Sequence, residues 1–215
     1  MSLSYQSRNS KKELLVFDFD GVLADSFNSF FPLIKDAMES IDINLTEKQY
    51  RDFFSGNVHH GFENFIKDEN KYSVFSKFRN KNYNKYLKNV CFFPGAVKVL
   101  KKLSRNHILT IASSSKQDYI LKLLKKNRVD KLFGAFLATT DHSKENMIKE
   151  ILAKFKVLPP KTIMITDTVG DIKIAKKIGL KTVAVIWGFH STKTLRSSKP
   201  DFIADNFNEL ANYLN

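Results

Sequence analysis

The sequence predicts an α/β protein with a doubly wound parallel sheet and a small all-α domain inserted after the first strand. From Pro94 onwards, short apolar segments alternate with amphipathic helical segments, as in a parallel sheet covered on both faces. The apolar run from Leu14 to Phe17 comes earlier and is expected to join the same sheet. We therefore predict a core domain over 1–26 and 90–215 and a helical domain over 27–89.

The elements of the core follow from their hydrophobic patterns. The expected strands are short apolar runs, and the expected helices carry apolar residues at spacings of three and four. Pro94-Gly95 signals a turn before a helix, and Gly179 is expected as a left-handed helix cap. The strands are predicted at 14–17 (the central strand), 107–112, 135–139, 162–166, 181–188 and 201–205, and the helices at 97–103, 116–127, 144–155, 171–179 and 207–214.

The segment 27–89 is predicted to form several short helices around a core of its own. Its phenylalanines recur at spacings of three or four, which is typical of inward-facing helix surfaces. Pro32 is expected in a first turn or at a bend. The pattern favours a packed helical core over a cofactor site. The phenylalanines are Phe27, Phe30, Phe31, Phe53, Phe54, Phe62, Phe65, Phe75 and Phe78.

Composition limits the class of protein. The chain has 215 residues, of which 43% are hydrophobic, and these values suit a globular domain with a sizeable core. One cysteine, Cys91, excludes an internal disulfide and favours a reducing compartment. The first residues lack the apolar segment of a signal peptide, and no apolar run is long enough to span a bilayer. We therefore expect a soluble, cytoplasmic monomer or weak dimer.

The formal net charge of +13 has two interpretations. It could indicate a nucleic-acid partner, or a lysine-rich surface spread over solvated faces. The lysines are scattered along the chain without a zinc-finger spacing or a basic-region helix, which favours the second interpretation. Nucleic acid is therefore not the expected partner, although the excess charge should attract anionic substrates.

Polar side chains follow several of the predicted strands at their carboxyl ends, where parallel sheets bind ligands. Two aspartates, spaced i and i+2, come directly after the buried run 14–17. Acidic groups, hydroxyls and an ammonium group at one edge predict a site for a divalent cation and a phosphate, with Mg²⁺ favoured because the ligands are oxygens. These side chains are Asp18, Asp20, Ser113, Ser114, Ser115, Lys144, Asp167 and Asp171.

These motifs resemble those of the haloacid dehalogenase superfamily. "DFDGVLADS" is similar to its first motif, Asp-x-Asp-Gly-Thr/Val-x-x-Asp-Ser, and "TIASSS" to its second. Lys144 fits the third motif and "ITDTVGD" the fourth, in the expected order and over nearly the whole chain. The resemblance implies a Rossmann-like core, with 27–89 as a helical cap of the first-insertion type that closes over small substrates.

The resemblance also implies a set of catalytic roles. Asp18 would be the nucleophile that forms an aspartyl-phosphate, and Asp20 the general acid and then the base that activates water. Ser113, with Ser114 beside it, would bind phosphoryl oxygens, and Lys144 would neutralise charge on the phosphate and the nucleophile.

The metal ligands implied by the resemblance are carboxylates of the same motifs. Mg²⁺ would be held by Asp18, Asp167 and the backbone carbonyl of Asp20. Asp171 is expected to support the metal shell through water or Lys144. Asp25 and Ser26, at the end of the first motif, are expected to cap the next helix and have no predicted chemistry.

Three positions depart from the usual motifs. Val22 replaces the commonest threonine, which is an accepted variant. Glu145 follows the predicted lysine where proline is usual, so Lys149 is an alternative, but Lys144 is preferred at the loop-to-helix junction. Thr166 replaces the common glycine before Asp167 and is expected to alter packing more than chemistry.

An aspartate at position 20 points to a phosphatase or a phosphomutase, since the family's dehalogenases lack an acid/base group there. The loop "FFSGNVHHGF" resembles the cap loop that contacts the leaving group, so Asn57, His59 and His60 are candidate specificity residues; a solvated loop with incidental histidines is the alternative. The C-terminal segment resembles the phosphoglycolate phosphatase branch. The alternatives are a β-phosphoglucomutase-like enzyme and a non-catalytic nucleic-acid-binding or regulatory protein.

Overall fold

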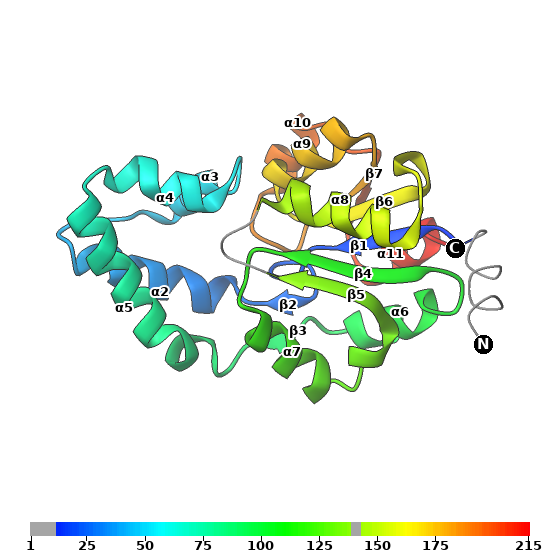
Figure 1. The fold of residues 1–215 in the computed structure, drawn as a ribbon, viewed down its shortest axis with the longest axis horizontal. Coiled ribbons are helices and arrows are strands. Elements are labelled where there is room, and N and C mark those ends of the chain that lie inside the picture. Colours follow the sequence, from blue (N-terminus) through cyan, green and yellow to red (C-terminus); the bar gives the residue numbers. More distant parts are fainter. Residues whose placement is uncertain (1–11, 139–142) are drawn as a thin grey trace.

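The computed structural model describes residues 12–138 and 143–215. Six parallel strands form one sheet in the order β5-β4-β1-β6-β7-β8 (Figure 1). The predicted central strand is confirmed, because β1 pairs with β4 on one side and β6 on the other. The strands are β1 (Leu14–Phe17), β4 (Ile108–Ser113), β5 (Phe133–Ala138), β6 (Thr162–Thr166), β7 (Lys181–Val185) and β8 (Phe202–Ala204).

Helices cover both faces of the sheet, as the alternating pattern predicts. Leu15 and Phe17 of β1 pack on one face, in a buried cluster that includes residues of α6, α7 and α11. Leu14 and Val16 pack on the other face, against α8 and α9. The helices are α6 (Ala96–Leu103), α7 (Gln117–Lys126), α8 (Lys144–Phe155), α9 (Val169–Ile178), α10 (Thr192–Ser197) and α11 (Phe207–Tyr213), with short 3₁₀ turns η1 (Asp130–Leu132) and η2 (Pro159–Lys161).

The local signals in the sequence have mixed outcomes. Gly179 follows α9 in the left-handed conformation, with φ of 88°. Ser26 precedes α2 at the N-cap position, but its side chain makes no capping hydrogen bond there. The short helix α10 was not predicted, since its six residues are too few to carry a clear periodicity.

Four helices lie between the first two strands of the large sheet and form a unit beside it, which we call the helical insertion (Figure 1). They are α2 (Phe27–Glu39), α3 (Glu47–Phe53), α4 (Val58–Ile66) and α5 (Glu69–Leu87). The insertion has its own apolar cluster, in which Phe62 and Phe75 are buried. Phe189, from the core, belongs to the same cluster and contacts the rings of Phe27, Tyr50 and Phe54.

A small antiparallel ribbon joins the two crossings between the insertion and the core. β2 (Ala24–Asp25) pairs with β3 (Cys91–Phe92), in the register Ala24 to Phe92 and Asp25 to Cys91. The sequence carries no signal for strands of two residues, because their pairing depends on segments far apart in the chain. The ribbon places both ends of the insertion beside the carboxyl end of β1. No helix within the described ranges is both long and apolar enough to cross a membrane.

Candidate active site

Asp18 directly follows β1, which lies between the half of the sheet formed by β4 and β5 and the half formed by β6, β7 and β8. Its backbone N–H donates to the carbonyl of Ile165 at 2.9 Å, which continues the pairing of β1 with β6 beyond the strand. Its carboxylate is nearly inaccessible, and Oδ1 accepts from the N–H of Phe19 at 2.7 Å. The central strand therefore fixes the carboxylate by two backbone contacts.

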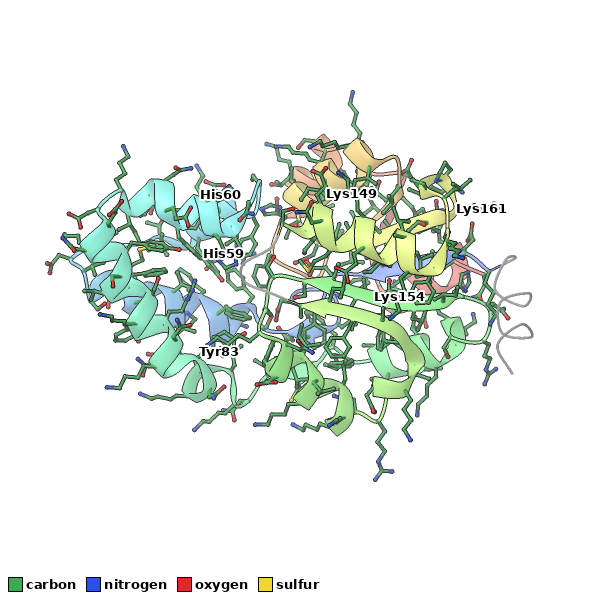
Figure 2. The ribbon with its side chains drawn as sticks, viewed as in Figure 1. His59, His60, Tyr83, Lys149, Lys154 and Lys161 are labelled. Atoms are coloured by element: carbon green, nitrogen blue, oxygen red, sulfur yellow. The ribbon has the colours of Figure 1, made fainter. Side chains whose placement is uncertain are left out.

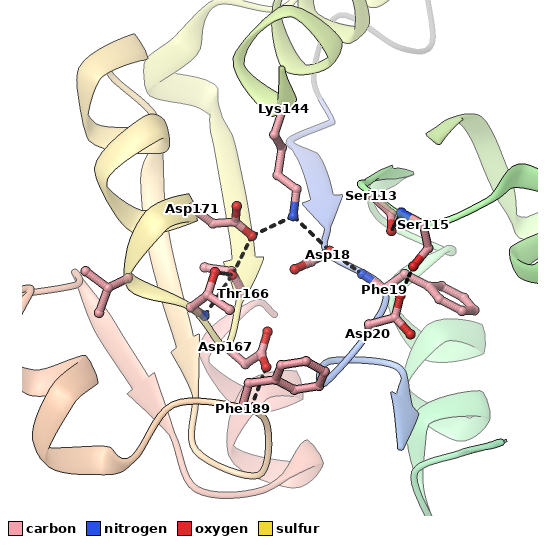
Figure 3. A network of polar contacts seen from close by, with 12 residues as sticks. Asp18, Phe19, Asp20, Ser113, Ser115, Lys144, Thr166, Asp167, Asp171 and Phe189 are labelled. Atoms are coloured by element: carbon pink, nitrogen blue, oxygen red, sulfur yellow. Dashed lines mark hydrogen bonds and ion pairs between the residues drawn. The ribbon is translucent and has the colours of Figure 1, made fainter. Parts of the chain in front are cut away.

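Lys144 begins α8 and provides the ammonium group of the site. Its Nζ lies 2.9 Å from Oδ1 of Asp18 and 2.7 Å from Oδ2 of Asp171, and its side chain is 9% exposed (Figure 3). The two carboxylates raise the pKa of Lys144 despite its burial, so the group stays charged. The alternative, Lys149, is exposed and pairs with Glu145 at 2.7 Å on the same helix (Figure 2). The structure therefore brings Lys144 to the site and leaves Lys149 outside it.

Thr166 is a member of the site that sequence reasoning assigned to packing alone. Its hydroxyl donates to Oδ2 of Asp171 at 2.9 Å and accepts from the N–H of Thr168 at 3.2 Å (Figure 3). A glycine at this position would leave both partners without this bond. The sequence contained one signal for this role, which is a hydroxyl side chain at the end of a buried strand. The partner of that hydroxyl, Asp171, could not be identified without the position of α9.

Asp167 is fully buried and is surrounded by backbone. Its Oδ2 accepts from the N–H of Phe189 at 2.6 Å. Gly21 and Gly188 leave room for it, since a Cβ atom at either position would lie 2.0 or 2.2 Å from Oδ2. Gly21 also has φ of 76°, which disfavours other residues. Burial raises the pKa of Asp167 to about 7. The hydrogen bond from the Phe189 N–H opposes this rise, and the charge of Asp171 adds to it.

The residues present fit a divalent cation. Oδ1 of Asp167 is buried and has no hydrogen-bond partner within the described residues, so one carboxylate oxygen lacks a counterpart. Asp18 has a raised pKa, first because it is buried and then because Asp171 and Asp167 repel its charge, while Lys144 opposes the rise. One ammonium group thus faces three carboxylates, and a cation bound by oxygen ligands would balance their charge.

Of the four aspartates predicted at the metal site, only Asp18 and Asp167 are expected to bind the cation through their side chains. In the described part of the chain, no three His, Cys, Asp or Glu side chains form a metal-binding group. The carboxylate of Asp171 is bonded to Lys144 and Thr166, and that of Asp20 is bonded to residues of α7 and of the loop after β4. The arrangement suits Asp18 and Asp167 as side-chain ligands, with Asp171 acting through its neighbours.

Asp20 is held by two hydroxyl groups on the other side of the site. Ser115 donates to Oδ2 at 2.5 Å (Figure 3). Tyr119 of α7 donates to Oδ1 at 3.0 Å. Burial raises the pKa of Asp20, and hydrogen bonding from Ser115 and Tyr119 opposes the rise. A carboxyl group with a raised pKa is suited to donate a proton. Tyr119 was missed because it lies on the buried face of an amphipathic helix, where an aromatic residue indicates packing.

The serine run contributes to a cavity of about 370 Å³ between the sheet edge and the helical insertion. Ser113 ends β4, is almost inaccessible, and accepts from the N–H of Ser115 at 3.2 Å. Ser113 and Ser114 line this cavity together with Asp18, Asp20 and the other charged groups of the edge. The hydroxyls and the ammonium group can donate to the oxygens of a phosphate placed there.

The predicted specificity loop has a mixed outcome. Asn57 and His59 line the cavity, whereas His60 is exposed and lies outside the lining (Figure 2). Asn57 also caps α4, because its Oδ1 accepts from the backbone N–H groups of His59 at 2.9 Å and His60 at 3.3 Å. The backbone N–H of His60 therefore contributes to the cap of α4, whereas its side chain lies outside the lining of the cavity.

His190 connects the insertion to the core. Its Nδ1 accepts from the N–H of Val169 at 3.0 Å, so its Nε2 carries the proton that it donates to the carbonyl of Arg51 at 2.8 Å. Nearby, the N–H of Gly170 donates to the carbonyl of Phe54 at 2.9 Å. These bonds hold α3 over the first turn of α9, which closes one side of the cavity. Sequence reasoning missed them, since the contacts between insertion and core join segments more than a hundred residues apart.

Comparisons with known proteins agree with the fold. The profile of the haloacid dehalogenase-like hydrolases matches residues 15–185. A phosphoglycolate phosphatase of Synechococcus elongatus is 25% identical over 205 residues, which cover 92% of this chain and 95% of that protein. The pyrophosphatase PpaX of Oceanobacillus iheyensis is 23% identical over 201 residues, with coverage of 91% and 94%.

Solved structures show the same fold. A haloacid dehalogenase-like hydrolase of Streptococcus pneumoniae superposes with a TM-score of 0.82 at 21% identity and covers 96% of this chain and 100% of its own. The family match spans all four acidic residues of the site. The chain therefore belongs to the haloacid dehalogenase-like hydrolases.

Proposed function

We propose that this chain is a Mg²⁺-dependent phosphatase that hydrolyses a small phosphomonoester, in the manner of the phosphoglycolate phosphatases. The observation that carries the proposal is the Asp18 carboxylate, which Lys144 and a backbone N–H hold through Oδ1 at the wall of the cavity. Both contacts use the same oxygen, which leaves Oδ2 as the attacking atom. The nearby ammonium group favours the charged form that a nucleophile requires.

The reaction proceeds in two displacements at phosphorus. Asp18 attacks, an Asp18–phosphoryl bond forms, and the bond to the leaving oxygen breaks as Asp20 gives that oxygen its proton. Asp20 then takes a proton from water, which attacks phosphorus and releases Asp18 and inorganic phosphate. Ser113 and Lys144 donate to the phosphoryl oxygens. Asp18, Asp167 and the carbonyl of Asp20 would hold Mg²⁺, which would supply positive charge to neutralise the phosphoryl group.

Substrate contact is assigned to the part of the helical insertion that lines the cavity. Asn57 and His59 are the residues of the predicted loop that reach it. The names of the relatives support phosphoglycolate and pyrophosphate as the first compounds to test. Phosphate release should therefore be measured over a panel of phosphorylated metabolites that includes both.

Asp18→Asn should lower kcat by at least about a thousandfold, because the amide oxygen is a poor nucleophile. The fold should be retained, as judged by circular dichroism and thermal denaturation. Asp25→Asn is the matched control, since Asp25 lies in the same motif but is exposed on β2. Normal phosphate release by Asp18→Asn would remove Asp18 from the role of nucleophile.

Removal of divalent cations with EDTA should reduce phosphate release to background, and excess Mg²⁺ should restore it. Without a bound cation, the buried carboxylates would repel the anionic substrate. EDTA that has been saturated with Mg²⁺ is the control for direct effects of the chelator. Activity that survives EDTA would exclude an essential dissociable metal.

Lys144→Met should lower kcat/KM by about a hundredfold or more, since it removes the ammonium group that is bonded to both Asp18 and Asp171. It should also lower the free energy of unfolding, by about 3–5 kcal/mol, because buried carboxylates lose their partner. Lys149→Met, on the exposed side of the same helix, should leave activity within about twofold. Equal effects of the two substitutions would contradict the assignment.

Asn57→Ala/His59→Ala should change the ratio of kcat/KM between two esters by about tenfold and leave Mg²⁺ dependence unaltered. His60→Ala, from the same helix, is the control. Thermal denaturation should accompany the assay, since loss of the Asn57 cap costs about 1 kcal/mol. If the double variant keeps the substrate profile of the wild type, neither residue contacts the substrate.

A further inference from the structure

Helix α5 carries a charged residue within its buried face. Phe75, Arg79, Tyr83 and Leu87 follow one another at intervals of four, so their side chains lie in one row. Phe75, Tyr83 and Leu87 are buried, and they form the stripe expected of a helix packed on a core. Arg79 interrupts this stripe and lines the same cavity as Asp18.

The guanidinium group of Arg79 has no anionic partner in the described structure. Within residues 12–138 and 143–215, the guanidinium group forms neither an ion pair nor a hydrogen bond. Its central carbon lies 5.6 Å from the centroid of the Phe75 ring, which is a cation–π contact. Burial lowers the pKa of Arg79, the direction expected for a cation removed from water. A partly desolvated charge without a partner is costly, and a structural role would be served as well by an apolar side chain.

Lys116 reaches the same space from the core. It immediately precedes α7, lines the cavity, and holds its Nζ 4.6 Å above the ring of Tyr83, one turn from Arg79 along α5. Its pKa is lowered by burial and by the charge of Arg79, so the two cations are close enough to repel each other. Like Arg79, it pairs with no carboxylate in the described ranges. An anion bound between them would relieve the repulsion.

We propose that Arg79 and Lys116 form a subsite for a second anionic group of the substrate, a carboxylate or a second phosphoryl group. This inference rests on the proposed phosphatase function, in which the reacting phosphoryl group occupies the end of the cavity at Asp18. The planar guanidinium group can donate two parallel hydrogen bonds to either kind of anion. Arg79 is thus a specificity residue: it comes from the helical insertion, whereas the reacting groups come from the core.

The experiment compares pairs of substrates that differ in the presence of one additional anionic group. Phosphoglycolate is compared with ethyl phosphate for the carboxylate, and pyrophosphate with methyl phosphate for the phosphoryl group. The quantity measured is the ratio of kcat/KM within each pair. Arg79→Met should lower the ratio by about tenfold to a hundredfold, the range for hydrogen bonds to a charged group. The pair whose ratio falls identifies the anion. Lys116→Met should lower the same ratio.

Two further variants control the result. Lys81→Met removes a charge from the exposed side of α5, outside the cavity, and should leave the ratio unchanged. Arg79→Lys should recover part of the ratio, which a purely structural role of Arg79 would not explain. A wild-type ratio near one for both pairs, or an unchanged ratio in Arg79→Met, would overturn the subsite, and hydrolysis of the esters that lack the second anionic group would still support the phosphatase.

A binding measurement separates the two proposals if the wild type hydrolyses no ester. Isothermal titration calorimetry would then compare phosphonopropionate, which carries the carboxylate, with propylphosphonate, which lacks it. Tighter binding of phosphonopropionate that is lost in Arg79→Met would support the subsite although the phosphatase proposal had failed. Equal affinities of the wild type for the two compounds would overturn the subsite.

Discussion

One ammonium group, on Lys144, faces the carboxylates that gather where β1 and β6 end. Asp171 disfavours the charged forms of Asp18 and Asp167, and all three side chains are removed from water. Buried charges are stable only when they are paired or bind a cation. The position of α8 relative to the sheet is therefore constrained by electrostatics as well as by packing, because its first residue must reach two carboxylates on two different elements.

The sheet order explains how these groups meet. The chain moves from β1 to β4 and β5 on one side and then returns to β6 on the other, so β1 lies at the point where the direction of winding reverses. Loops on either side of such a strand diverge and leave a crevice at its carboxyl end. Gly21 and Gly188 then allow two loops to approach the Asp167 carboxylate more closely than any side chain would permit. The same crevice supplies Asp20 with partners from α7 and the loop after β4.

The helical insertion completes the cavity and is joined to the core by specific contacts. Phe189 packs among the aromatic rings of the insertion, and His190 next to it bonds both Val169 of α9 and Arg51 of α3. The loop that carries these two residues also donates a backbone N–H to Asp167. Placement of the insertion and placement of a carboxylate of the site are therefore coupled through one short loop. Arg79 and Lys116 both line the cavity that this packing encloses.

Much of the fold and of the site could be predicted because the signals are local. Hydrophobic period distinguishes strands from helices, and parallel strands place their carboxyl ends at one edge. Asp18, Asp20, Ser113, Lys144 and Asp167 could therefore be expected together from their positions at the ends of predicted elements. The two short strands of the β2–β3 ribbon and the six residues of α10 are too short to carry a period.

By itself, the sequence determined the order of strands and helices, the acidic edge and the family, since each depends on residues that are neighbours in the chain. Tertiary structure alone decided the partners of each group. Thr166 meets Asp171, Tyr119 meets Asp20, and His60 lies outside the cavity although His59 lines it. These outcomes depend on how separate elements pack, and hydrogen bonds between elements leave no periodic trace in the sequence. Arg79 likewise lies in a helical row that predicts packing, and only the cavity beside it gives its charge a role.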